Sequence, residues 1–175
     1  MRPGLRSSLS GEAAFLKIAG FTLIELMIVV AIVAILATIA GPSLLEASLS
    51  GKIASYATDL VGSAQLARSE AIKRNTTVTM CVSADGASFG SGNWNQGWIL
   101  LVSGQVLRVQ AASEAGIQIN STSSAISFDP SGLVSSAATL TVCRKLPTVG
   151  RAERVVAISA TGKASLSKTS AGVCP

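Results

Sequence analysis

The chain has 175 residues, which is enough for one ordinary domain with a short appendage but not for two full domains. Apolar residues make up 49% of it and charged residues 13%, a bias that indicates a membrane segment, and the formal net charge is +5. The absence of histidine excludes a histidine-based catalytic triad and a histidine-ligated metal site.

Residues 21–41 form an apolar run that contains a single charged residue. As an α-helix this run would roughly match a hydrocarbon core about 30 Å thick, because each helical residue rises about 1.5 Å. Arg2, Arg6 and Lys17 precede the run. By the positive-inside rule, residues 1–20 are expected to stay cytoplasmic and the C-terminal body to lie outside.

Three ordinary interpretations compete for this run. It is a plain transmembrane anchor, a signal peptide that is cut after the small residue Ala40, or a lipoprotein signal. The lipoprotein signal is excluded because no cysteine lies near the segment. The other two leave Glu25 without an explanation.

Glu25 is an ionisable residue close to the start of the apolar run. A charged group in a membrane helix costs about 2.5–3.5 kcal/mol on insertion scales, so such residues normally have a partner. No basic residue lies between Lys17 and Lys52. A cut between Gly20 and Phe21 would create an α-amino group four residues before Glu25, and this group could neutralise the carboxylate within one chain or between subunits.

The sequence from Gly20 to Leu26, GFTLIEL, resembles the prepilin processing motif of type IV pilins and type II secretion pseudopilins. The resemblance implies that a membrane peptidase, the prepilin peptidase, cuts after Gly20 and methylates Phe21. It also implies that Glu25 meets the amine of an adjacent subunit during assembly. Pro42 stands where members of the family bend or melt the helix, and proline removes one backbone donor there.

The helical pattern continues over residues 42–75. One amphipathic stripe is predicted to pack on the C-terminal body. The opposite side is predicted to carry Ser55, Asp59, Ser63, Ser69 and Lys73, and Asn75 is a reasonable end of the helix. The residues of the stripe are Ile53, Tyr56, Leu60, Ala64, Ala67 and Ala71.

Beyond residue 75 the pattern has the period of two that is typical of strands. Residues 84–97 are predicted to form a loop, and Asp129-Pro130-Ser131-Gly132 a turn. The fold class is therefore α+β, with a long N-terminal helix packed on one antiparallel sheet. The predicted strands are 76–83, 98–102, 106–110, 117–120, 125–128, 139–144, 154–159 and 164–167.

The body resembles the FimT/GspH family of minor pilins and pseudopilins. Three stretches carry this resemblance: Cys81–Val102 with its Asn93-Trp94 and Gly97-Trp98 pairs, Phe128–Gly132, and Thr141-Val142-Cys143. The sequence departs from the family in lacking a second cysteine a few residues after Cys81. Compared with those family members, Cys81 therefore lacks the nearby cysteine that is its usual partner.

Cys81, Cys143 and Cys174 are the three cysteines, and an odd count leaves one thiol unpaired or bound to another chain. The mature body is expected to face an oxidising compartment. We expect a Cys143–Cys174 disulfide, worth roughly 3–4 kcal/mol in the chain-entropy model. Cys81 would then be a buried strand thiol.

The last part of the chain, residues 143–175, holds six basic residues and one acidic residue. This excess predicts either a solvated surface or an anionic partner such as DNA. Family members that bind DNA carry a Gly-Arg-x-Arg element near the C-terminus, where this chain has Gly162-Lys163-Ala164-Ser165. The candidate DNA-binding residues are Arg144, Lys145, Arg151, Arg154, Lys163 and Lys168.

These features predict four parts: a cleaved leader (1–20), a transmembrane and assembly helix (21–41), its amphipathic continuation (42–75) and a β-rich periplasmic body (76–175). The predicted function is that of a minor pilin or pseudopilin, with the prepilin peptidase, other subunits and the bacterial inner membrane as partners. DNA capture for natural transformation is the alternative. No catalytic residue, cofactor or metal site is expected.

Overall fold

The computed structural model describes residues 21–145 and 153–169, except for the side chains of residues 39–43 and 45. The chain divides into two compact units, Met1–Gly41 and Pro42–Pro175. One α-helix, α1 (Leu23–Arg74), contributes to both. Its backbone stays helical through Pro42, so the helix break expected there is not observed. A proline removes a single donor, and the hydrogen bonds of the adjacent turns can keep the helix continuous.

The C-terminal end of α1 is closed by Asn75, which the sequence predicts as the end of the helix. Asn75 adopts φ 50°, in the left-handed region that asparagine tolerates better than most residues. The N–H of Asn75 donates to the Ile72 carbonyl at 3.3 Å, and the N–H of Thr76 donates to the Ala71 carbonyl at 3.2 Å. These two bonds are those of a Schellman cap, which satisfies the last carbonyl groups of a helix.

Within the described residues, α1 is followed by strands and one short 3₁₀ helix. All the predicted strands are confirmed, with ends that differ by at most two residues. The 3₁₀ helix lies inside the predicted loop 84–97. The elements are β1 (Val78–Val82), η1 (Trp94–Gln96), β2 (Trp98–Val102), β3 (Gln105–Gln110), β4 (Ile117–Ser121), β5 (Ala125–Phe128), β6 (Ala138–Arg144), β7 (Glu153–Ile158) and β8 (Ala164–Thr169).

The strands form two four-stranded sheets, so the prediction of a single sheet is wrong. The first sheet has the order β3-β2-β1-β5 and the second has the order β4-β6-β7-β8. Every pairing is antiparallel. The chain enters the second sheet with β4, returns to the first with β5 and then completes the second. Such an exchange depends on which strands pair over long distances, and the local pattern does not encode this.

The hairpin between β2 and β3 shows how local sequence sets one register. Ser103 and Gly104 connect the two strands with φ values of 48° and 78°. Two consecutive positive φ angles define the tight turn whose twist matches that of paired strands. Val102 therefore faces Gln105 directly, and β3 begins one residue earlier than predicted.

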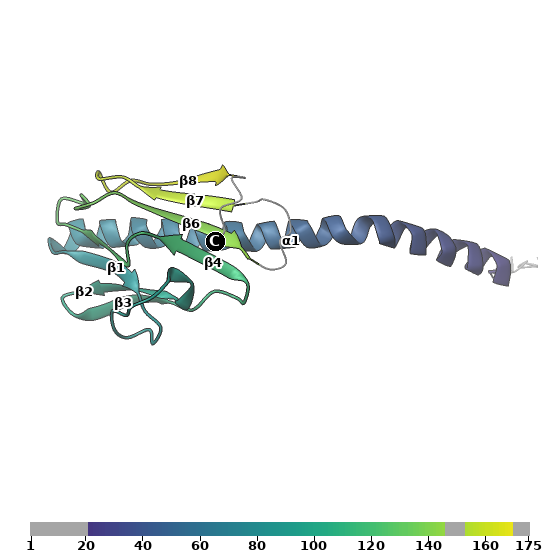
Figure 1. Cartoon of the computed structure of the whole chain (residues 1–175), viewed down its shortest axis with the longest axis horizontal. Coiled ribbons are helices and arrows are strands. Elements are labelled where there is room, and N and C mark those ends of the chain that lie inside the picture. Colours follow the sequence, from purple (N-terminus) through teal and green to yellow (C-terminus); the bar gives the residue numbers. More distant parts are fainter. Residues whose placement is uncertain (1–20, 146–152, 170–175) are drawn as a thin grey trace, which may run out of the picture. The chain divides into compact units, whose positions relative to one another are not determined.

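One hydrophobic core joins α1 to both sheets, and Figure 1 shows strands of both sheets along the C-terminal half of the helix. The predicted stripe is confirmed, with Tyr56 only partly buried and Ala57 as an additional buried member. Ser63 was predicted on the opposite, exposed side, and this is wrong, because its side chain is completely buried. The reason lies in Trp98.

Trp98 is the first residue of β2 and is 1% exposed. Its indole N–H donates to the Ser63 hydroxyl at 3.0 Å, so a polar helix position is buried because it satisfies the tryptophan. Trp94 lies beside it, with 6.4 Å between the ring centroids and a 54° angle between the ring planes. The Trp94 indole donates to the Ser123 carbonyl at 2.7 Å. The two tryptophans thus anchor both η1 and β2 to the core.

Ser63→Ala should destabilise the protein by about 1–3 kcal/mol, because it leaves the buried Trp98 N–H without an acceptor. Urea unfolding followed by tryptophan fluorescence measures this change. Ser69→Ala is the matched control, since the exposed Ser69 hydroxyl bonds only to the Leu66 carbonyl of its own helix. Equal stability of the two variants would contradict the assigned role of Ser63.

Cys81 should resist alkylation in the folded protein. It is a free thiol on β1 with no exposed surface, and burial raises its pKa to about 11. Iodoacetamide at pH 8 should modify Cys81 only after denaturation.

Cys143 is buried on β6, but Cys174 lies outside the described residues, so the Cys143–Cys174 disulfide stays a prediction. Non-reducing peptide mapping tests it, and a bridge that includes Cys81 would overturn it.

Candidate functional site

The N-terminal end of α1 carries the residues of the predicted processing and assembly site. Gly20 lies outside the described residues, whereas Phe21 is 78% exposed and immediately precedes the helix cap. The Glu25 N–H donates to the Thr22 hydroxyl at 3.3 Å, and the Leu26 N–H donates to the Thr22 carbonyl at 3.1 Å. Thr22 is therefore the N-cap of α1, and Glu25 is the third helical residue.

This arrangement gives Glu25 a local role that the sequence analysis did not identify. A threonine followed three residues later by a glutamate is the sequence signature of a capping box, and Thr22-x-x-Glu25 has that spacing. A carboxylate in the first turn also interacts favourably with the positive end of the helix dipole. Glu25 can thus stabilise the helix start as well as meet an amine. The signal was present in the sequence.

The side chains that follow Glu25 are apolar and exposed all around the helix. No helix within the described residues is long and apolar enough to cross a membrane, and the membrane span predicted over residues 21–41 is not confirmed. The large exposed side chains of this part are Leu23, Ile24, Leu26, Met27, Ile28, Val29, Val30, Ile32, Val33, Ile35 and Leu36.

A shallow apolar depression of about 310 Å³ lies on the same part of α1. Its lining combines larger side chains with the small residues Ala31 and Ala34, which let another helix approach closely. The larger side chains that line it are Leu26, Met27 and Val30. This surface is suited to contact with other apolar helices.

The structure separates the candidate DNA-binding residues into two places. Arg144 and Lys145 lie at the C-terminal end of β6, and Arg154 faces Lys168 directly across β7 and β8. Because the strands are antiparallel, these four residues share one end of the second sheet. Lys163 lies in the β7–β8 turn at the other end, and Arg151 lies outside the described residues.

Lys163 instead lies near a cation that sequence reasoning did not single out. Arg68 of α1 donates from Nε to the Gly132 carbonyl at 3.2 Å. Gly162, next to Lys163, has φ 72°, and a Cβ there would come within 2.0 Å of the same carbonyl oxygen. Only glycine permits this close approach. The surrounding groove of about 350 Å³ is lined by Gln65, Arg68, Ser69, Ile72, Gly162, Lys163 and Ala164.

Carboxylates elsewhere in the body organise turns. Asp129 accepts hydrogen bonds from the Ser131 hydroxyl, the Leu133 N–H and the Ser131 N–H, and these bonds lower its pKa. Ser88 contributes most to lowering the pKa of Asp85 in the same way.

The described residues contain no cluster of three or more cysteine, aspartate or glutamate side chains that could hold a metal ion.

Comparisons with known proteins agree with this architecture. A family model described as "Type II transport protein GspH" matches residues 56–162, and one described as "Prokaryotic N-terminal methylation motif" matches residues 16–41. No curated protein matches the chain.

Among solved structures, the type IV minor pilin FimU of Pseudomonas aeruginosa (strain PAO1) has a TM-score of 0.55 and 24% identity over 69% of this chain and 90% of that chain. The minor pseudopilin EpsH of the Vibrio cholerae type 2 secretion system has a TM-score of 0.44 and 13% identity over 67% of this chain and 96% of that chain. The FimU likeness shows a pilin-like fold, and the profile match covers more than half of the sequence. The chain therefore belongs to the GspH family of minor pilins and pseudopilins.

Proposed function

We propose that this chain is a minor subunit of a type II secretion pseudopilus or a type IV pilus. It would be cut between Gly20 and Phe21, methylated at Phe21 and then built into the fibre through its N-terminal helix. The observation that carries this proposal is the apolar surface that surrounds α1 from Leu23 to Leu36. Such a surface is unstable in water and requires an apolar environment.

The apolar helix would have two such environments in turn. Before assembly the subunit would be held at the bacterial inner membrane, with residues 42–175 on the periplasmic side. In the fibre the same side chains would pack against the helices of neighbouring subunits. Exposure to water would cost about 25 cal/mol per Å² of apolar surface, so the helix should pass from the membrane directly into the fibre, where close packing of its side chains replaces contact with lipid.

Glu25 would give this otherwise nonspecific packing a defined register. After cleavage the Phe21 amine of one subunit is a cation, and it can pair with the Glu25 carboxylate of another. In apolar surroundings an unpaired carboxylate is costly, so a subunit in the wrong position would be disfavoured. Methylation keeps the amine positively charged. The charge pair would therefore select the axial position at which one subunit follows another.

DNA capture remains the alternative function. It rests on the four cations at one end of the second sheet, namely Arg144, Lys145, Arg154 and Lys168. Lys163 lies at the opposite end of the β7–β8 hairpin and does not join them. We therefore propose the structural role as the main function.

Processing can be tested directly on protein extracted from membranes of the host. Intact mass spectrometry should show a chain that begins at Phe21 and carries one additional methyl group. Gly20→Ala should retain some cleavage, whereas a bulky residue such as Gly20→Leu should block it and leave the leader attached. A native chain that begins at Met1 or at Gly41 would contradict the proposed processing.

Glu25→Gln separates the two roles of Glu25, because glutamine can replace glutamate in a capping box but carries no charge. It should leave the helix intact and lower recovery in sheared fibres by about tenfold, the effect of losing about 1.4 kcal/mol. Thr22→Ala should weaken only the helix start, by about 1 kcal/mol. Glu46→Gln is the matched control, since Glu46 is an exposed glutamate on the same helix.

Recovery in fibres should be compared with the total amount of each variant in the cell, so that degradation is not mistaken for failed assembly. Normal incorporation of Glu25→Gln would show that charge neutralisation is not required. Because glutamine preserves the capping box, a loss in Thr22→Ala without a loss in Glu25→Gln would assign the role of Glu25 to helix capping alone.

A further inference from the structure

Strand β8 leaves the edge of the second sheet open. Among the described residues, 21–145 and 153–169, it pairs only with β7, and residues 165–168 are exposed. Figure 1 shows β8 on the outer side of this sheet. An edge strand presents unpaired backbone N–H and C=O groups to solvent. β8 is six residues long and contains no proline.

The other edge strands of the described residues are interrupted or covered. β3 carries a register irregularity opposite Leu100 and Leu101, and β5 is extended by a bridge between Phe128 and Val134. β4 packs against η1. β8 pairs with β7 in unbroken register from Glu153–Thr169 to Ile158–Ala164. It is therefore the edge best suited to accept another strand.

The face of β8 on the core side of the sheet is only partly buried. Leu166 faces Val156, and Ala164 faces Ile158, so these β8 residues share the side of the sheet that is buried in β7. Leu166 is nevertheless 43% exposed. The groove between α1 and the start of β8 adjoins this strand, and the 50% exposed Ile72 lines it.

The charged side chains that line the groove or lie on β8 are all cations. Arg68 and Lys163 line the groove, and Lys168 faces Arg154 near the end of β8. Like charges that face each other across two strands are unfavourable, so this arrangement stabilises an anionic partner more than it stabilises the isolated fold. Within the described residues, none of these four cations has an ion pair with a carboxylate.

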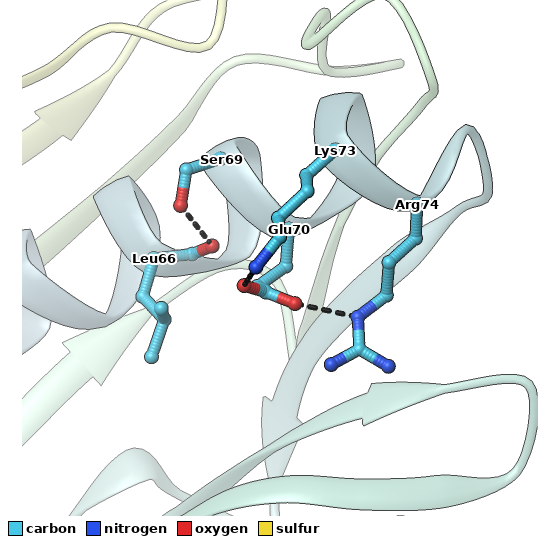
Figure 2. Close-up of polar contacts among 5 residues, drawn as sticks. All are labelled: Leu66, Ser69, Glu70, Lys73 and Arg74. Atoms are coloured by element: carbon cyan, nitrogen blue, oxygen red, sulfur yellow. Dashed lines mark hydrogen bonds and ion pairs between the residues drawn. The ribbon is translucent and has the colours of Figure 1, made fainter.

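Of the nearby carboxylates, those of Glu70 and Asp129 are already engaged and that of Glu153 is buried. Figure 2 shows the Glu70 carboxylate turned toward Lys73 and Arg74, with which it forms ion pairs. The bond from Arg74 is the main cause of the lowered pKa of Glu70. Asp129 accepts bonds within its own turn. Glu153 is buried on the opposite face of β7 from Arg154.

We infer that the β8 edge and the adjoining groove bind an extended acidic segment of a partner polypeptide, which adds a fifth strand to the second sheet. Its backbone would bond to the open groups of β8. Acidic side chains would meet Arg68, Lys163 and Lys168. Leu166 and Lys168 lie two residues apart on the same face of β8, so an apolar side chain two residues from the acidic one would cover Leu166. A second copy of β8 would bring lysines against lysines, so the same charges disfavour self-pairing.

The open backbone edge and the exposed Leu166 favour a polypeptide over a nucleic acid. Neither feature has a complement in a phosphate backbone, and β8 and the groove contain no aromatic side chain on which a base could stack. The inference does not require the assembly role of Glu25, because it concerns residues 42–175 alone.

The test uses the purified full chain in detergent and a short fluorescent peptide of valine and glutamate in which each face of the extended strand carries both residue types two positions apart. Anisotropy measures binding, and hydrogen exchange with mass spectrometry measures protection of β8. We expect saturable binding that slows exchange in residues 164–169. The double variant K163E/K168E should bind about tenfold more weakly. R108E, which reverses an exposed charge on β3, should bind as the unaltered chain does.

Two further probes separate strand addition from simple charge attraction. The same peptide with methyl groups on alternate backbone nitrogens cannot form the ladder and should bind much more weakly. The same peptide with lysine in place of every glutamate should bind K163E/K168E but not the unaltered chain.

Equal binding of the methylated peptide, unchanged exchange in β8, or an equal loss of binding in R108E would overturn the inference. It would also be overturned if a duplex oligonucleotide bound and required Lys163 and Lys168 while the acidic peptide did not bind.

Discussion

The body depends on how closely the two sheets can approach α1. The buried face of the helix is built largely from small residues, with Ala57, Ala64, Ala67 and Ala71 all completely buried. Small side chains allow the strands to lie near the helix, and the larger side chains of the sheets fill the remaining space. Trp98 is one of these larger side chains, and the Ser63 hydroxyl accepts a hydrogen bond from its indole N–H. A larger residue at any of these alanines would force the sheets outward.

This packing determines where the molecule has open surface. One helix covers the inner face of the second sheet over β6 and β7, where Leu140, Val142, Val156 and Ile158 are buried. β8 extends past this cover, which leaves Leu166 exposed and a groove beside α1. The close contact of Gly162 with the Gly132 carbonyl fixes the turn that carries Lys163. The proposed acidic partner would pair with the open edge of β8 and cover Leu166.

The two units of the chain differ in whether their apolar side chains are buried or exposed. The described part of the second unit buries most of its apolar side chains in one core, whereas the described part of the first unit exposes them. A helix that is apolar on all sides cannot be satisfied within one subunit. In the proposed fibre, other subunits would supply the contacts that the isolated chain lacks. The Thr22 hydroxyl, which accepts a hydrogen bond from the Glu25 N–H, caps the start of this helix.

The sequence by itself determined the local features: the helix over residues 42–75 and its end at Asn75, the positions of the strands, the Ser103-Gly104 turn and the processing motif around Phe21. Each depends on residues that are neighbours in the chain, so periodicity and turn chemistry reveal them. The Thr22 cap also depends on neighbouring residues, but it was not predicted from the sequence. Only the tertiary structure decided the division into two sheets, the burial of Ser63 by Trp98, the separation of Lys163 from the other cations and its proximity to Arg68. These features depend on pairing between distant segments, and a one-residue change in helix phase or strand partner would leave the local pattern unchanged.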